Sequence, residues 1–93
     1  MARTLDEYRH KLNDKIFLAE SSRDVLRFSD TALRSLNEDN VHSYIIVRFI
    51  DKTVMNLEEV SALRIGEKQQ SNIKSAIDHF VHVRRKYQNN TVS

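Results

Sequence analysis

The chain has 93 residues, of which 40% are hydrophobic and 30% are charged, and this composition is typical of one soluble globular domain. It contains one Gly and no Pro, so the residues that usually form β-turns are almost missing, which argues strongly against an all-β fold. It has no Cys and a formal net charge of only +2, which excludes disulfides and thiolate chemistry and permits nucleic-acid binding without implying it.

The first predicted element is a long helix over residues 4–36. Its apolar positions recur every seven residues, as in a coiled coil, at Leu5, Leu12, Ala19, Leu26 and Leu33. The segment 20–24 is entirely polar, and Ser21 with Asp24 three residues later suits the start of a second helix. One helix and two helices are both open, and we favour one because neither Gly nor Pro forces a break. On that interpretation, Leu26→Asp costs several kcal/mol of stability.

The second predicted element is a helix over residues 41–65, after a break at 37–40 whose Asn and Asp side chains suit helix caps. Residues 44–50 taken alone resemble a buried β-strand, because all of them except Arg48 are aromatic or β-branched. The apolar spacing of three or four continues beyond this segment, however, and favours a helix. Gly66 then suits a left-handed residue that ends the helix.

The third predicted element is a helix that starts just after Gly66. Its inner stripe consists of Ile73, Ala76, Ile77, Phe80, Arg84 and Tyr87. We therefore expect an all-α fold, a small antiparallel helical bundle of three long helices, or of four if the first breaks near Ser21-Ser22. Residues 1–93 form a single helical-bundle domain, in which 88–93 are a frayed polar tail. The first helix is longer than the others, and its unmatched apolar stripe predicts an oligomer.

Catalytic and metal sites are not expected. Glu7 with His10 and His79 with His82 have the spacing of metal ligands, but the first pair lies off the apolar stripe and a di-iron site needs two inward-facing pairs. A single Gly cannot build a phosphate loop. No nucleophile has a plausible base, and no carboxylates are placed as a catalytic pair. We expect no catalytic residue, no metal, no cofactor and no small-molecule substrate, and hence no enzyme.

The stretch 57–77 resembles a helix-turn-helix motif in outline. An acidic and apolar segment leads to Gly66, and Ile73 follows as an apolar anchor. The motif calls for an apolar residue where Asn72 stands, so the outline is degenerate. Positive charge is also in excess toward the C-terminal end. A DNA- or RNA-binding regulator is therefore the alternative function, with contacts from Lys68, Lys74, Arg84, Arg85 and Lys86.

The function that we favour is a non-enzymatic protein–protein interaction module or small regulator. We expect it to act through apolar helix faces and to associate with itself as a homodimer. Aromatic residues beside a core stripe are suited to partner contact. The candidates for partner binding are Phe17, Phe28, Tyr44 and Phe49. The chain has acidic residues near its start and no apolar run long enough to span a membrane, so we expect a cytoplasmic protein without membrane contact.

Overall fold

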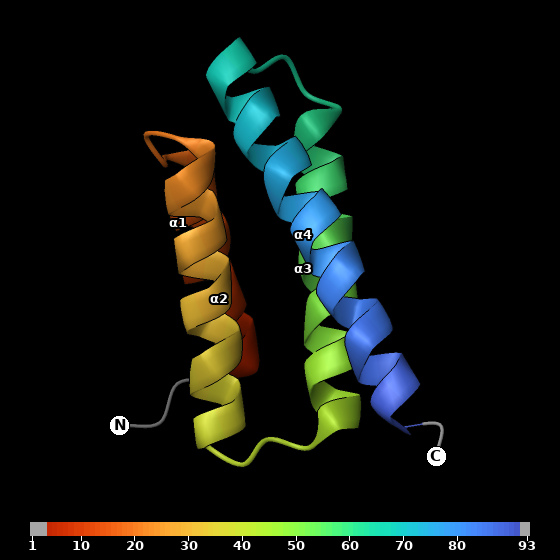
Figure 1. Ribbon diagram of the computed structural model, residues 1–93. Coiled ribbons are helices and arrows are strands. Elements are labelled where there is room, and N and C mark those ends of the chain that lie inside the picture. The colour runs from red at the N-terminus through yellow and green to blue at the C-terminus, as the bar shows by residue number, and fades with distance from the viewer. Residues whose placement is uncertain (1–3, 92–93) are drawn as a thin grey trace.

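Four helices make up most of residues 4–91, the part of the chain that the computed structural model describes, with side chains described as far as residue 87 (Figure 1). They are α1 Leu5–Phe17, α2 Ser22–Glu38, α3 Ser43–Ser61 and α4 Glu67–Thr91. No strand occurs within the described range, and the predicted all-α fold is confirmed. Residues 44–50 belong to α3, which rules out the β-strand interpretation of that segment.

The break between α1 and α2 produces four helices where we favoured three. α1 ends at Phe17, and Ser21 takes an extended backbone conformation with φ −156° and ψ 166°. The Ser21 hydroxyl accepts a hydrogen bond from the backbone N–H of Asp24 at 3.4 Å, which satisfies a donor that the first turn of α2 leaves free. The segment 20–24 has no apolar side chain whose burial would stabilise one continuous helix. The alternative with two helices is therefore the correct one.

The seven-residue pattern does not continue across this break. Because α2 starts from its own cap, its buried face is set independently of α1, and it consists of Val25, Ser29, Ala32, Leu33 and Leu36. Leu26 is 39% exposed, whereas Val25 is 0% exposed. The expected continuous coiled-coil stripe is therefore wrong, and with Leu26 this exposed the structure no longer supports a large cost for Leu26→Asp. The overhang of a long first helix, from which we predicted an oligomer, disappears as well.

The residue with a left-handed backbone conformation follows α2 and not α3, where it was expected. Asn40 has φ 59°, and Gly66 does not have a positive φ. The N–H of Asn40 donates to the carbonyl of Asn37 at 3.1 Å, and the N–H of Val41 donates to the carbonyl of Leu36 at 3.0 Å. These two bonds form a Schellman motif, in which Asn is the usual alternative to Gly. The expectation for Gly66 is wrong because α3 ends earlier than predicted, so that Gly66 directly precedes α4.

The ends of α3 and α4 differ from the predicted ones by a few residues. α3 starts at Ser43 because His42 caps it, and the Nδ1 atom of His42 accepts a hydrogen bond from the N–H of Tyr44 at 3.1 Å. α4 starts directly after Gly66, as expected, but continues through Thr91. Residues 88–91, which we expected in a frayed tail, thus belong to the helix. The rest of that tail, 92–93, lies outside the described residues.

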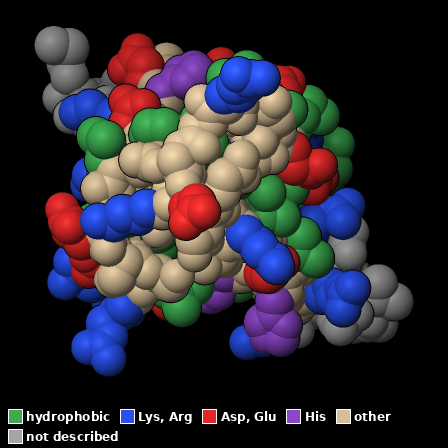
Figure 2. Space-filling view, turned by 90° about the horizontal axis from the view of Figure 1, so that it is seen from above, with side chains coloured by type: hydrophobic (Ala, Val, Ile, Leu, Met, Phe, Trp, Pro, Cys, Tyr) green, Lys and Arg blue, Asp and Glu red, His purple; other side chains and the backbone are tan. Residues whose placement is uncertain are grey.

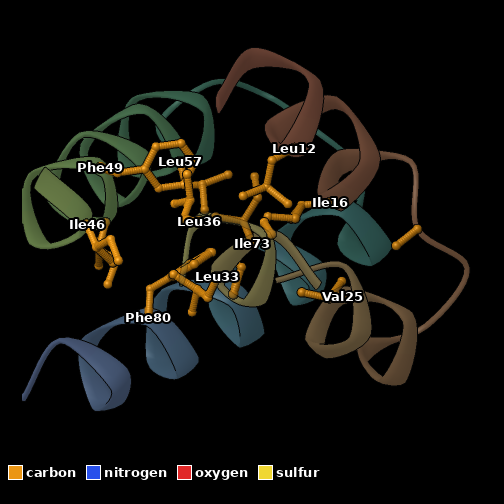
Figure 3. Close-up of a cluster of buried hydrophobic side chains, with 14 residues drawn as sticks. Leu12, Ile16, Val25, Leu33, Leu36, Ile46, Phe49, Leu57, Ile73 and Phe80 are labelled. Carbon is orange, nitrogen blue, oxygen red and sulfur yellow. The ribbon is translucent and has the colours of Figure 1, made fainter. Parts of the chain in front are cut away.

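The helices pack in the order α1, α2, α4, α3 around the bundle, with α3 returning to α1 and with α1 also contacting α4 across the bundle. Figure 1 shows α1 with α2 and α3 with α4 as two antiparallel pairs. Apolar side chains from all four helices meet between the pairs, which provides the main stabilisation of the fold. Figure 3 shows this cluster, which includes Leu12 and Ile16 of α1, Leu33 of α2, Phe49 of α3 and Phe80 of α4.

Candidate functional site

The four aromatic residues selected for partner binding do not form one surface. Phe49 is 3% exposed, and its ring centre lies 6.0 Å from that of Tyr8. It is a core residue, because α3 is apolar on two sides and this side faces α1, and its selection as a surface contact is corrected accordingly. Tyr44 is exposed in the first turn of α3, with its ring near Arg48. Phe17 and Phe28 are half-buried and pack against the core.

Phe28 lies in a groove of about 320 Å³ between α1 and α2. The apolar side chains that line it are Tyr8, Leu12, Phe28 and Ala32, and the basic ones are Lys11, Lys15 and Arg27, with Thr31 between them. We call these eight residues the α1/α2 groove. Of the residues predicted for partner binding, it contains Phe28 and none of the other three.

Helical spacing explains how each helix contributes one wall. Tyr8, Lys11 and Lys15 are three and four residues apart on α1, so their side chains lie on one face. Phe28 and Ala32 are four residues apart on α2 and form the facing wall. The Tyr8 ring also packs against the core, as its contact with Phe49 shows. The floor of the groove is therefore continuous with the hydrophobic core.

Positive charges surround the ring of Phe28. The Nζ atom of Lys15 lies 5.8 Å from the ring centre and the Cζ atom of Arg27 lies 5.5 Å from it, distances at which a cation is attracted to the ring. Arg27 is also in an ion pair with Asp24 at 3.2 Å. Neither Lys11 nor Lys15 forms an ion pair with any described residue. The groove therefore has positive charge that the described part of the chain does not neutralise.

This arrangement suits a ligand that is apolar in its centre and negatively charged at its edge. Contact with Phe28 and Leu12 removes apolar surface from water, which is favourable by about 25 cal/mol per Å². The two lysines attract carboxylates and orient them.

The histidines with metal-ligand spacing are not part of this groove. His79 lies 2.7 Å from a carboxylate oxygen of Asp30, which joins α4 to α2. His10 and His82 are exposed. Among the side chains that the structure describes, residues 4–87, no three His, Cys, Asp or Glu residues are grouped as a metal site requires.

The five basic residues selected for nucleic-acid binding lie along α4. Lys68 is paired with Glu20 at 3.1 Å, and Arg84 is paired with Asp51 at 2.7 Å. The exposed members without an ion pair among the described residues are Lys74, Arg85 and Lys86. Any phosphate contact by this helix thus depends mainly on these three.

The stretch 57–77 does not have the arrangement of a helix-turn-helix motif. α3 and α4 lie side by side and run antiparallel (Figure 1), whereas the helices of that motif cross at about 90–120°. Asn72, at the position where the motif needs an apolar anchor, is buried, and its side-chain amide donates to the carbonyl of Ala19 at 2.8 Å. Its role is to cap the turn between α1 and α2.

Exposed leucines at one end of the bundle are a second place to look for a binding surface. Leu18 follows α1 and Leu63 follows α3, and both are largely exposed. Figure 2 looks onto this end, where the hydrophobic side chains lie in separate groups between charged ones. This view shows no continuous apolar surface, so the α1/α2 groove is the stronger candidate.

Sequence reasoning identified Phe28 but missed Lys11, Lys15 and Arg27. The spacing of the two lysines already places them on one face of a helix, and this signal is present in the sequence. The sequence of α1 or of α2 alone does not show which face of α2 lies opposite the face of α1 that carries Lys11 and Lys15. This pairing of faces depends on the turn at 18–21, where we favoured a continuous helix.

Comparison of the chain with protein-family models, with curated proteins and with solved structures gives no match. None of the described helices is long and apolar enough to cross a membrane. The side chains of the α1/α2 groove are therefore the basis on which a function is inferred.

Proposed function

We propose that this chain is a non-enzymatic protein-interaction module whose α1/α2 groove binds an apolar segment of a protein partner that carries acidic residues. The observation that supports this most directly is the half-buried ring of Phe28 beside Lys15, in a groove that Lys11 also lines. Neither lysine has an ion pair among the described residues. A groove between two helices suits the side chains of a third helix. A cytoplasmic setting is part of the proposal and is supported by the absence of Cys from the sequence.

Apolar contact and charge have different roles in this binding. Covering Phe28 and the apolar residues around it removes them from water, and this provides most of the affinity. Lys11 and Lys15 are exposed, so their ion pairs with a partner are weak, but they orient the partner and speed its association. We therefore expect added salt to weaken binding modestly. Phosphate contacts to a nucleic acid would instead lose affinity steeply with salt.

A synthetic amphipathic helix with Leu and Met on one face and Glu at its edges tests this proposal. Titrated into the full chain by calorimetry, it is expected to bind saturably with one site per chain. Lys11→Glu with Lys15→Glu is expected to weaken binding about tenfold, because two reversed charges remove about 1.4 kcal/mol. The matched control is Lys74→Glu with Arg85→Glu, two reversals on α4 outside the groove, which leave the affinity unchanged.

A peptide that does not bind contradicts the proposal, and so does either of two results when it binds. One is equal binding of this peptide and of a peptide in which each Glu is replaced by Lys. The other is an affinity that does not respond to the reversals at Lys11 and Lys15. A single-stranded oligonucleotide tests the alternative function, a DNA- or RNA-binding regulator. Oligonucleotide binding that falls steeply with salt and is abolished by reversing Lys74 and Arg85, together with no peptide binding, would establish that alternative instead.

A further inference from the structure

α3 and α4 form a second groove on the other half of the bundle. The apolar side chains that line it are Val54, Met55 and Val81, and the charged ones are Asp51, Glu58, Glu59 and Arg84. We call these seven residues the α3/α4 groove. Met55 is 60% exposed and Val81 is 37% exposed, so this groove presents apolar surface that the described chain does not cover.

The charge of the α3/α4 groove is opposite to that of the α1/α2 groove. Arg84 lies 2.7 Å from Asp51, and the charges of this pair offset each other. Glu58 and Glu59 are exposed, and neither forms an ion pair with a described residue. Net negative charge therefore lies beside the apolar side chains of this groove, whereas net positive charge lies beside those of the α1/α2 groove.

The packing order places the two grooves on opposite sides of the molecule. Around the bundle, α1 is followed by α2, α4 and α3, so the side between α1 and α2 faces away from the side between α3 and α4. Figure 1 shows the same two pairs as separate halves. One copy cannot bring its own two grooves together, and both are open to other copies.

The spacing of the groups also matches between the grooves. Met55 and Glu59 are four residues apart, which places them one turn apart on the same face of α3. Lys11 and Lys15 are likewise one turn apart on α1, and Lys15 lies beside the Phe28 ring. Contact of a methionine thioether with an aromatic ring is favourable. With Met55 against Phe28, Lys15 lies beside this contact and Lys11 lies one turn further along α1, which is the distance that separates Glu59 from Met55 on α3, so that Glu59 comes near Lys11.

We propose that the α3/α4 groove of one copy docks into the α1/α2 groove of a second copy. This inference rests on the proposed function, because it uses the same α1/α2 groove and names a second copy of the chain as its partner. Because two different surfaces meet in this contact, an assembly of any length keeps a free α1/α2 groove at one end and a free α3/α4 groove at the other, where further copies can bind. The assembly is an open head-to-tail chain, which differs from the closed homodimer expected from the sequence.

Two variants, each with one groove disabled, test this geometry. Lys11→Glu with Lys15→Glu reverses the charge of the α1/α2 groove. Met55→Lys replaces the apolar contact of the α3/α4 groove by a positive charge, which Lys15 and Arg27 beside the Phe28 ring of the other copy repel. All three side chains are exposed, and circular dichroism checks that each variant is folded. Sedimentation is measured for the native chain, each variant and their mixture at up to about 1 mM, where even a weak contact is half formed.

The native chain is expected to form species whose mass keeps rising with concentration, and each variant alone is expected to need at least about tenfold higher concentration to reach the same mass. The mixture is expected to form a dimer of one copy of each, because it contains one intact groove of each kind. A native chain that stays monomeric, a variant that assembles as the native chain does, or a mixture without the mixed dimer would overturn the inference.

Peptide binding and self-assembly together distinguish a failure of this inference from a failure of the proposed function. If the acidic peptide binds the α1/α2 groove but the two variants do not combine, the groove binds another protein and the inference alone fails. If the peptide does not bind and the native chain stays monomeric, both fail.

Discussion

Val25 and Leu26 are adjacent apolar residues of α2, yet Val25 is fully buried and Leu26 is substantially exposed. The apolar pattern shows that one side of this segment faces the core. Which of the two neighbours faces inward depends on where the helix starts, and the Ser21 cap sets that start. The same limit applies to the aromatic residues, because Phe49 and Phe28 both lie beside an apolar stripe but only Phe49 is enclosed by a neighbouring helix.

Paired substitutions at these two positions measure this difference. Val25→Asp is expected to lower the free energy of unfolding by at least about 3 kcal/mol, because it places an unpaired carboxylate in the core. Leu26→Asp is expected to lower it by less than about 1 kcal/mol, because the carboxylate remains in water. Urea denaturation followed by circular dichroism gives both values. Similar losses in the two variants would show that the buried face of α2 is not the one described here.

At the scale of the helices, the spacing of apolar residues predicts most of the helical segments that the structure contains. The helical nature of α3 and α4 follows from apolar spacings of three and four, and the all-α fold follows from the near absence of Gly and Pro. The break at 18–21 is not decided by local sequence, since the cap at Ser21 competes with a continuous helix. A tertiary contact also stabilises this break, because Asn72 of α4 donates a hydrogen bond to the Ala19 carbonyl in the turn. No local pattern in α1 or α2 reveals that partner.

Removing the Asn72 amide therefore tests what holds the turn. Asn72→Leu keeps a side chain of similar size but leaves the buried Ala19 carbonyl without its donor, and we expect a loss of about 1–3 kcal/mol of unfolding free energy. Ser75→Ala is the matched control, because it removes the exposed hydrogen bond from α4 to Ser22 and is expected to cost less than about 0.5 kcal/mol. Equal effects of the two substitutions in urea denaturation would contradict a capping role for Asn72.

At the scale of the whole molecule, a net charge of +2 conceals an uneven distribution. Basic side chains border the apolar α1/α2 groove, and acidic side chains border the α3/α4 groove on the opposite side. Composition gives only the net charge, and helix periodicity shows only which residues share a face of one helix. The distribution arises when the pairs assemble in the order α1, α2, α4, α3. For this reason the sequence alone led to the prediction of an interaction module but did not locate the α1/α2 groove that we propose as its binding site.

The location of binding is the central claim of this account, and nuclear magnetic resonance measures it most directly. The acidic amphipathic peptide is titrated into the ¹⁵N-labelled chain, and the backbone amide shifts are followed residue by residue. We expect the largest changes along the groove faces of α1 and α2, around Lys11, Lys15 and Phe28, and much smaller ones along the face of α4 that carries Lys74 and Arg85. Changes concentrated on that α4 face, or spread evenly over the four helices, would contradict the assignment of the α1/α2 groove as the binding site.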